Sequence, residues 1–351
     1  MMFEMGVNKV SGKINESFFL KTIHTKCGFP RKEVLQGPAY GVDVALIELP
    51  GDLVMAMASD PLTLIPSLGL EESAWLSVHL MANDIATTGF SPQYAQFVLN
   101  LPASLSAGDF QLYWNYIDRY CRQLGVSITG GHTGFAEGIN STIAGGGTMM
   151  AIAPKTEILL SSQARPGNVI LVTKTCALSS SAILGMSFPK TVINELGKEV
   201  YDLACRLFYH TSSIGEALLA APLAVAMHDV TEGGVLGAIA EMAVAAGIGA
   251  EVYGELLPIA GYQNEICRLF GLDPRFCIGA GSMIIAADEK NADEIIQKLR
   301  ASNIDCCVVG KFTDQTGNVR LFDGDEQKQL TAQERDPYWA AYLHAWEKGW
   351  T

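Results

Sequence analysis

The stretch HDVTEGGVLGAIAEMAVAAG, residues 228–247, joins a polar, turn-forming start to an apolar segment that contains one charged residue. Its apolar positions, spaced i, i+4, i+7 and i+11, predict the buried face of a helix: Val235, Ile239, Met242 and Ala246. Gly247 is placed to end this helix, and Gly233 and Gly234 leave the N–H groups of its first turn without side-chain cover. Two interpretations stay open. Either Asp229 or Thr231 is an ordinary N-cap, or the helix start binds an anion.

The whole chain has the composition of a globular protein with room for two domains, because 49% of its 351 residues are apolar. Its net charge of −13 has the wrong sign for a nucleic-acid or anionic-membrane surface, so we expect neither as a partner. The first residues lack the apolar core of a signal peptide, and no apolar run reaches the roughly 18 residues of a membrane span. The eight cysteines form no CxxC pair. We therefore expect reduced thiols in a cytoplasmic protein.

Alternating strand-like and helical patterns predict an α/β, or α+β, layer structure in both halves of the chain. In the first half we expect strands at 42–49, 53–59, 93–101 and 141–153, and helices at 71–88 and 107–124. In the second half we expect strands at 168–174, 282–287 and 306–312, and helices at 191–220 and 291–302. A polar run before Pro166-Gly167 places a domain boundary near residue 160. The predicted domains are 1–160 and 161–320, followed by a helical tail at 321–351.

The tail is expected to form a helix with Asp336 at its cap and Pro337 in its first turn. Aromatic residues recur at every fourth position along it: Tyr338, Tyr342, Trp346 and Trp350. Such a stripe is typical of packing, on the same chain or on a subunit partner, rather than of a ligand cage.

Three acidic residues of the first half interrupt apolar sequence. Asp43 and Asp60 lie at the edges of predicted strands, where a carboxylate is costly unless it is paired or coordinates a hard cation. Asp84 follows Asn83 in the last turns of the predicted helix 71–88, where the helix dipole disfavours an unpaired carboxylate. The counter-charge is either a lysine or arginine side chain or a metal ion, and the sequence leaves both alternatives open.

The segment ITGGHTGF, residues 128–135, is a further candidate. Gly130 and Gly131 follow a strand-like run and permit the backbone to approach a ligand closely. His132 is either a binding residue or a satisfied polar side chain. Standard phosphate-loop, dinucleotide-binding, zinc-protease and nucleophile-elbow motifs are absent from the sequence, so a nucleotide would have to bind through another architecture.

Several motifs in order resemble the AIR synthase (PurM) superfamily, most closely its HypE-like branch related to hydrogenase maturation factors: GPAYGVDVA, ASDPLT, VHLMANDIATTGFSPQ, GGHT, ARPGNVILVTK, MHDVTEGGVLGAIAEMA and LFGLDP. The resemblance covers nearly the whole chain. It implies an AIR synthase-like two-domain fold, in which the N-terminal domains of a homodimer form a β-barrel and the C-terminal domain is α+β. It also implies that ATP and Mg²⁺ bind in the cleft between the domains.

The resemblance also assigns candidate site residues. By motif, the magnesium-binding acids are Asp43, Asp60, Asp84 and Asp229. The residues near the nucleotide, its phosphates or the substrate are Lys13, Asn83, Gly130, Gly131, Thr231 and Gly233. The expected catalytic residues are Asp84, Asp229 and His132. Physical reasoning agrees with the metal assignment, because a cleft lined by carboxylates repels a triphosphate unless divalent cations bridge the two.

The activity that this resemblance implies is phosphoryl transfer from ATP to a weakly nucleophilic oxygen of a small molecule or of a maturation partner. HypE ends in a reactive cysteine, whereas the last cysteine here is Cys307 and the sequence ends at Thr351, so we expect chemistry other than that of HypE. Selenophosphate synthetase and thiamine-monophosphate kinase share part of the pattern and are alternatives. A non-catalytic nucleotide-binding assembly protein is the alternative of a different class, favoured by Val42 in place of an acid that often precedes Asp43.

Overall fold

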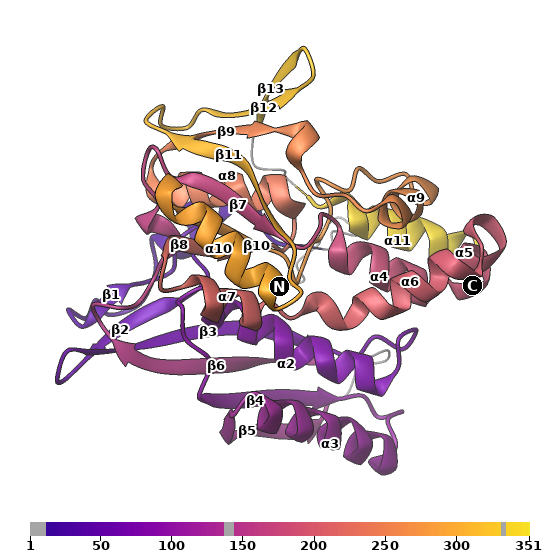
Figure 1. Ribbon diagram of the computed structural model, residues 1–351. Coiled ribbons are helices and arrows are strands. Elements are labelled where there is room, and N and C mark those ends of the chain that lie inside the picture. The colour runs from indigo at the N-terminus through magenta and orange to yellow at the C-terminus, as the bar shows by residue number, and fades with distance from the viewer. Residues whose placement is uncertain (1–11, 137–143, 331–334) are drawn as a thin grey trace.

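The computed structural model describes residues 12–136, 144–330 and 335–351, which form two β-sheets with helices between and around them (Figure 1). The first sheet has six strands in the order β1-β2-β3-β6-β4-β5, and the second has seven in the order β13-β12-β9-β11-β7-β10-β8. This arrangement confirms the expected α/β (α+β) layer structure. None of the helices in these described ranges is long and apolar enough to cross a membrane.

The first sheet belongs to the first half of the chain. Its strands are β1 (Val34–Gln36), β2 (Ala45–Leu49), β3 (Leu53–Thr63), β4 (Tyr94–Leu101), β5 (Ser127–Phe135) and β6 (Ala144–Pro154). Its helices are α1 (Glu16–Phe19), the π-helical turn η1 (Leu20–His24), α2 (Leu70–Ala86) and α3 (Ala107–Gln123). The predicted strands and helices of this half are confirmed, except that residues 141–143 lie outside the described residues.

The second sheet begins after the 3₁₀ turn η2 (Ser161–Gln163). Its strands are β7 (Val169–Thr173), β8 (Ala224–Asp229), β9 (Gly249–Tyr253), β10 (Met283–Ala287), β11 (Cys306–Thr313), β12 (Val319–Asp323) and β13 (Glu326–Leu330). The helices are α4 (Leu178–Ser187), α5 (Pro189–Leu196), α6 (Lys198–Phe208), η3 (Tyr209–Thr211), α7 (Ile214–Ala220), α8 (Gly234–Ala246), η4 (Gly254–Leu256), α9 (Gly261–Leu269) and α10 (Glu289–Ala301). The predicted range 191–220 is thus three helices, because Gly197 and the turn at 209–213 interrupt it.

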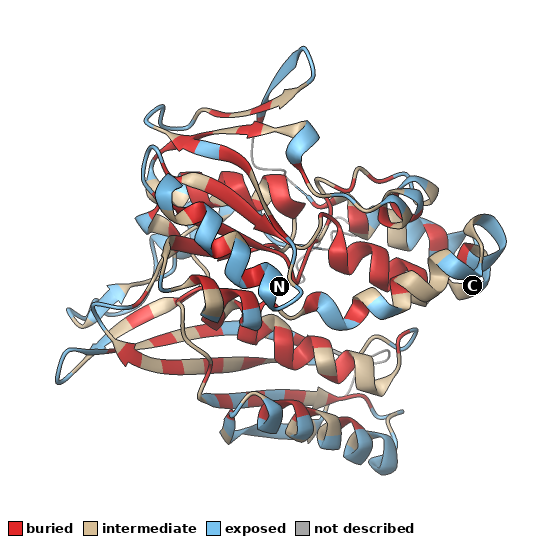
Figure 2. Ribbon diagram, in the orientation of Figure 1, coloured by how far each residue is buried: buried red, intermediate tan, exposed pale blue. Residues whose placement is uncertain are grey.

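Helix α2 occupies the layer between the two sheets. One apolar cluster joins its buried side chains to the first sheet and, through α7 and α10, to one face of the second sheet. A second cluster packs α8 on the other face of the second sheet, and a third joins α4, α6, α9 and the C-terminal helix α11 (Pro337–Glu347). The central strands of the second sheet are buried along their length (Figure 2). The C-terminal end of α2 and the end of β8 therefore lie inside the molecule rather than on its surface.

The tail differs from the expectation in one respect. Strand β12 pairs with β9 and β13, so the second sheet runs through the predicted boundary at residue 321 and ends at Leu330. Helix α11 begins after Asp336, as predicted, and Tyr342 and Trp350 pack on Phe188 of the same chain. Trp346 is 66% exposed, so it does not pack on its own chain, and packing of this residue on a subunit partner stays a prediction.

Candidate active site

Four carboxylates from different elements approach one another where the two domains meet. Asp43 lies just before β2, Asp60 lies on β3, Asp84 lies in the last turn of α2, and Asp229 ends β8. Oxygen atoms of Asp43 and Asp229 lie within 4.8 Å of each other. The charges of Asp229, Asp60 and Asp43 also act on Asp84. The structure thus brings together all four acids that the motifs select.

Burial and mutual repulsion make these carboxylates hard to ionise. Burial is the main cause that raises the pKa of Asp84 well above its usual value, and the neighbouring acids add to it. The pKa of Asp229 rises to about 7 and that of Asp60 to about 6, again chiefly through burial. In the described part of the chain, none of these three acids forms an ion pair with lysine or arginine. A hard divalent cation is the counter-charge that such an oxygen cluster fits.

Strand register explains why Asp60 faces this cluster. Asp60 pairs with Gly147 of β6, and Gly147 pairs with Phe97 of β4. Residues directly opposite each other in neighbouring strands project to the same face, so these three positions share one face of the sheet. Phe97 packs edge-on against Trp114 of α3, and a Cβ on Gly147 would lie 2.7 Å from Met81 of α2. The face that carries Asp60 is therefore the helix-covered face, which α2 brings Asp84 to meet.

Two site residues were missed by the sequence reasoning: His228 and Glu241. The Nδ1 atom of His228 lies 2.8 Å from Asp43 Oδ1, and its Nε2 atom lies 3.2 Å from Glu241 Oε2. Burial opposes protonation of this imidazole, but the two carboxylates outweigh it and raise its pKa to about 10. Held between these two carboxylates, His228 serves here as a counter-ion for Asp43 and Glu241.

Lys13 lies beside the acidic cluster, and its role toward a nucleotide stays a prediction. Its Nζ donates to Thr231 Oγ1 at 2.8 Å, and its backbone N–H donates to Glu232 Oε2 at 2.8 Å. Lys13 remains exposed to solvent, and although desolvation lowers its pKa, the carboxylates of Glu241, Asp229, Asp84 and Asp43 raise it above its usual value. Lys13 is thus held as a cation above an excess of negative charge.

The start of helix α8 does meet an anion, and that anion belongs to the chain itself. The backbone N–H of Gly233 donates to Asp336 Oδ2 at 2.7 Å, and the N–H of Tyr338 donates to Asp336 Oδ1 at 2.8 Å. One carboxylate therefore caps α11 and also accepts a hydrogen bond from the buried N-terminal end of α8. Asp336 is only 4% exposed, and this burial raises its pKa to about 6. The Gly233 N–H expected to face a phosphate is already satisfied in this conformation.

The predicted segment Gly130–His132 lies elsewhere. It is part of β5, the edge strand, and Gly131 is three strands from Asp60 in the same row, or about 14 Å at the usual strand spacing. A Cβ on Gly131 would lie 1.8 Å from Phe97 O, so this glycine permits close strand pairing rather than close approach to a ligand. His132 pairs with Val98, and both side chains are exposed on the face opposite to Asp60.

Asn83 is fully buried and its side chain contacts backbone rather than open space. Its Nδ2 donates to Thr211 O at 2.9 Å, and its Oδ1 accepts the Ser213 N–H at 2.8 Å. These bonds join the end of α2 to the turn after α6. Within a single chain, Asn83 therefore links the first domain to the second at the position next to Asp84.

The sequence did contain signals for the two missed residues. Glu241 is the single charge within an apolar helix, so it needs a buried partner. Gly41 has φ +73°, and a Cβ there would lie 2.3 Å from Glu241 O, so this glycine lets the Asp43 loop pack directly on α8. His228 precedes Asp229 in a strand that is buried at this end. Only the fold reveals that this histidine lies between Asp43 and Glu241.

Comparison with known proteins agrees with this geometry. The family model described as AIR synthase related protein, N-terminal domain, matches residues 41–152, and the corresponding C-terminal domain model matches residues 165–322. The chain is 26% identical to the carbamoyl dehydratase HypE of Cupriavidus necator over 74% of this chain and 73% of that protein. It is also 26% identical to the selenide, water dikinase of Methanococcus maripaludis, over 70% of this chain and 76% of that protein.

A solved structure of the hydrogenase maturation protein HypE in complex with ATP has the same fold. It superimposes with a TM-score of 0.66 at 20% identity, over 84% of this chain and 89% of that chain. The two-domain arrangement of the first and second sheets is thus the one that these solved proteins share.

Proposed function

Because the chain belongs to the AIR synthase-related family and is HypE-like, we propose that it is an ATP- and magnesium-dependent phosphoryl-transfer enzyme. The acceptor is an oxygen atom of a small molecule or of a maturation partner protein. The main support for this proposal is the set of carboxylates formed by the half-buried Asp60 and Asp84 and the buried Asp229, which form no direct ion pair with lysine or arginine in the described residues.

The residues fit a divalent cation and a triphosphate in the following way. Asp43, Asp60, Asp84 and Asp229 would hold Mg²⁺ through carboxylate oxygens, the ligands that hard cations prefer. The bound cation would neutralise phosphate charge and bridge it to the acidic cleft. Lys13 lies beside the same acids and would supply a second positive charge to a phosphate oxygen. His228 lies between Asp43 and Glu241 and keeps both carboxylates in place through its two ring nitrogens.

We further propose that the outer face of the first sheet is covered by a second copy. Side chains alternate along β3 and β6, so that one set is buried against α2 and the other, including Met57 and Met150, is only half-buried. The GGHT segment lies on this sheet away from the acids of its own chain, so Gly130 and His132 reach a phosphate only in a neighbouring protomer.

Light scattering measures the molar mass of the protein in solution. A monomer at the concentration used in the activity assay contradicts the proposed dimer.

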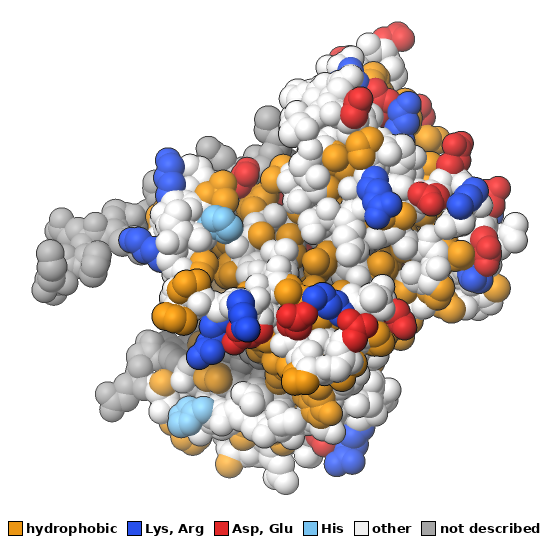
Figure 3. Space-filling model, turned by 90° about the vertical axis from the view of Figure 1, so that its left-hand side faces the viewer, with side chains coloured by type: hydrophobic (Ala, Val, Ile, Leu, Met, Phe, Trp, Pro, Cys, Tyr) orange, Lys and Arg blue, Asp and Glu red, His pale blue; other side chains and the backbone are white. Residues whose placement is uncertain are grey.

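On the surface shown in Figure 3, basic and acidic side chains are interspersed, and no broad area on that face is basic alone. This distribution and the net charge of −13 favour a small anionic substrate bound with its metal over a nucleic acid.

A metabolite panel scored for ADP release in the presence of Mg²⁺ tests the activity. The matched variants are Asp84→Asn, within the cluster, and Asp118→Asn, which removes an exposed ion pair with Arg122 on α3. We expect turnover in the wild type and in Asp118→Asn, and a loss on the order of 100-fold or more in Asp84→Asn with the fold intact. Unchanged turnover in Asp84→Asn contradicts the assigned site.

The alternative, a non-catalytic nucleotide-binding assembly protein, is favoured by one contact. The Gly233 N–H already donates its hydrogen bond to Asp336, so it is not free to stabilise a phosphate during phosphoryl transfer. Tight ATP binding with unchanged nucleotide after long incubation supports this alternative and contradicts the enzyme.

A further inference from the structure

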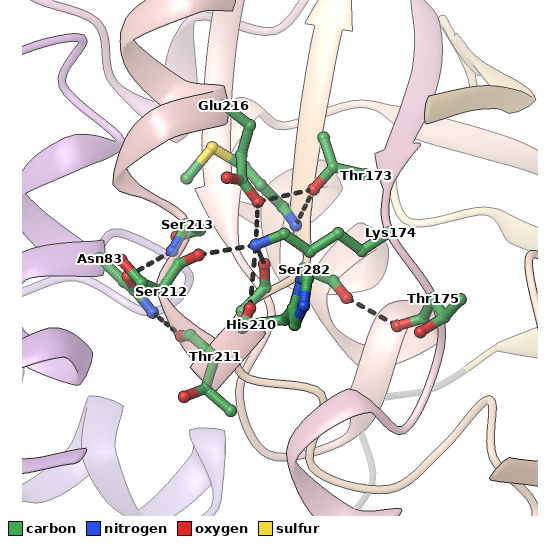
Figure 4. Close-up of polar contacts among 12 residues, drawn as sticks. Asn83, Thr173, Lys174, Thr175, His210, Thr211, Ser212, Ser213, Glu216 and Ser282 are labelled. Atoms are coloured by element: carbon green, nitrogen blue, oxygen red, sulfur yellow. Dashed lines mark hydrogen bonds and ion pairs between the residues drawn. The ribbon is translucent and has the colours of Figure 1, made fainter. Parts of the chain in front are cut away.

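The ammonium group of Lys174 is enclosed where the two domains meet (Figure 4). Its Nζ donates to the carbonyl oxygens of His210 at 2.9 Å, Ser212 at 2.6 Å and Gly281 at 2.9 Å, and pairs with Glu216 Oε1 at 2.7 Å. The Lys174 side chain is 12% exposed and that of Glu216 only 2%. Four oxygen acceptors therefore surround a cation that has three N–H donors, which saturates it.

The backbone at Lys174 is also unusual. It adopts φ +54°, in the left-handed region that non-glycine residues rarely occupy, and its N–H donates to Asp305 O at 2.7 Å. Such a conformation persists only where surrounding contacts fix it, and it is found most often at functional positions. At Lys174, this backbone conformation fixes the position of the ammonium group.

We call the four acceptors around the ammonium group, from His210, Ser212, Gly281 and Glu216, the Lys174 cage. On one side, this cage is linked to Asn83, the residue that precedes Asp84. Two of its carbonyls come from the turn 210–212, and the same turn accepts and donates the hydrogen bonds of Asn83 through Thr211 O and Ser213 N. Trp75 of α2 adds a hydrogen bond from Nε1 to Thr211 Oγ1 at 2.9 Å. Movement of this turn would therefore move the C-terminal end of α2, and Asp84 with it.

On the other side, the cage is linked to Asp229. Gly281 supplies the third carbonyl, and the next residue, Ser282, accepts the Val230 N–H at 3.1 Å. Met283 pairs with Asp229 across β10 and β8 and donates its N–H to Thr173 Oγ1, a neighbour of Glu216. The Lys174 cage thus connects, by short hydrogen-bonded steps, to an acid of each domain.

We propose that Lys174, together with Glu216, is a positioning residue that fixes the separation of Asp84 and Asp229 so that both bind the same metal-nucleotide group. This inference rests on the proposed function. A buried ion pair is weak evidence for stability, because desolvation offsets much of its attraction, and its better attested role is to specify one arrangement. Carboxylates that repel each other would separate without such a tie, and metal affinity depends on their spacing.

The experiment measures Mn²⁺ binding in the presence of ATP by electron paramagnetic resonance, together with the Mg²⁺ dependence of ADP release. The test variants are Lys174→Met and the isosteric Glu216→Gln. Lys198→Met, which removes an exposed pair with Asp202 on α6, is the matched charge control. Val192→Ala, a buried truncation on α5 away from the cage, is the control for lost stability alone.

We expect the dissociation constant for Mn²⁺ to rise about tenfold or more in Lys174→Met and in Glu216→Gln, as for other residues that orient metal ligands. Turnover at saturating Mg²⁺ should fall much less. In Lys174→Ala, added ethylammonium should enter the vacated cage and restore metal affinity toward that of the wild type. Lys198→Met and Val192→Ala should bind Mn²⁺ as the wild type does.

Three results overturn the inference: Mn²⁺ affinity within twofold of the wild type in both test variants, an equal loss in Val192→Ala, or no rescue by ethylammonium. If Lys174→Met does not fold, Glu216→Gln decides the question. Absence of Mn²⁺ binding in the wild type itself is a separate result, because it contradicts the proposed function and the positioning role together.

Discussion

Two clusters of buried charge lie at the junction of the domains, and they differ in how their charges are satisfied. Around Lys174, one ammonium group meets Glu216 and three carbonyl oxygens, so no charge is left without a partner. Around Asp84, four acids of the motif set face Lys13 and His228, and burial with mutual repulsion raises the pKa of most of them. The first cluster has the features of a structural tie, and the second has an excess of carboxylates, which a divalent cation would neutralise.

Burial alone therefore does not identify a functional charge. A saturated buried pair is disrupted by removal of either member, whereas an unsaturated cluster of like charges is relieved when one member is neutralised. The two clusters should therefore respond in opposite directions to the loss of one charge.

Lys174→Met should destabilise the protein by about 3–5 kcal/mol, because it leaves Glu216 as a buried charge without its partner. Chemical denaturation at pH 7.5 without metal measures the free energy of unfolding. A double variant, Lys174→Met with Glu216→Gln, should recover part of the loss. A single variant as stable as the wild type would show that this pair is not a tie.

Asp229→Asn should have the opposite effect in the absence of divalent cations. Neutralising one of several mutually repelling carboxylates should raise the free energy of unfolding by roughly 1–3 kcal/mol at pH 8, a discounted value for a pKa raised to about 7. Thermal denaturation with and without Mg²⁺ and ATP is the measurement. We expect the added ligands to stabilise the wild type and not the variant. Destabilisation of the metal-free variant would contradict the repulsion.

The pH dependence follows from the same shifts. The folded-state pKa values of Asp229, about 7, and of Asp60, about 6, lie above the ordinary value of 3.8, so the folded protein binds more protons between pH 4 and 7. Stability of the metal-free protein should therefore fall as the pH rises through this window. His228, with a pKa of about 10, continues the fall from pH 6.5 to 10. Saturating Mg²⁺ should flatten the slope between pH 4 and 7, and an unchanged slope would count against metal binding by these acids.

Asp336→Ala removes the carboxylate that occupies the start of α8 and caps α11. The expected loss of stability is about 1 kcal/mol, the usual cost of a lost N-cap. Calorimetric titration should at the same time show unchanged or tighter binding of Mg²⁺ and ATP, because the Gly233 N–H is released. Weaker nucleotide binding would mean that Asp336 supports the site.

Lys198→Met should change the free energy of unfolding by less than about 0.5 kcal/mol, because its pair with Asp202 is exposed and screened by solvent. Equilibrium denaturation beside Lys174→Met compares an exposed and a buried lysine pair directly. Equal losses in the two variants would remove the distinction between the clusters.

Sequence patterns predicted the fold well where periodicity was strong. Helices α2, α3 and α8 appear close to their expected ranges, since an apolar stripe and a terminal glycine define each of them locally. Helix α4 was not predicted, because LSSSAILGMS is buried on nearly all sides and shows no amphipathic stripe. The continuation of the second sheet past residue 320 was not predicted, because the pairing of β12 with β9 depends on residues far away in sequence.

The acidic part of the site was predictable and its surroundings were not. A carboxylate in an apolar run indicates a need for counter-charge, which selected Asp43, Asp60 and Asp84. Which residue fills that need is a property of tertiary structure. The sequence gives no sign that His228 lies between Asp43 and Glu241, or that Asp336, more than 100 positions away, satisfies Gly233.

The most direct test is a crystal structure grown with Mn²⁺ and a non-hydrolysable ATP analogue, with anomalous scattering used to locate the metal. We predict that Mn²⁺ is bound by oxygens of Asp84 and Asp229 and by the analogue's phosphates, with Lys174 still enclosed by its carbonyls. A structure with the analogue bound but its metal elsewhere, and these acids still facing one another without a cation, would contradict it.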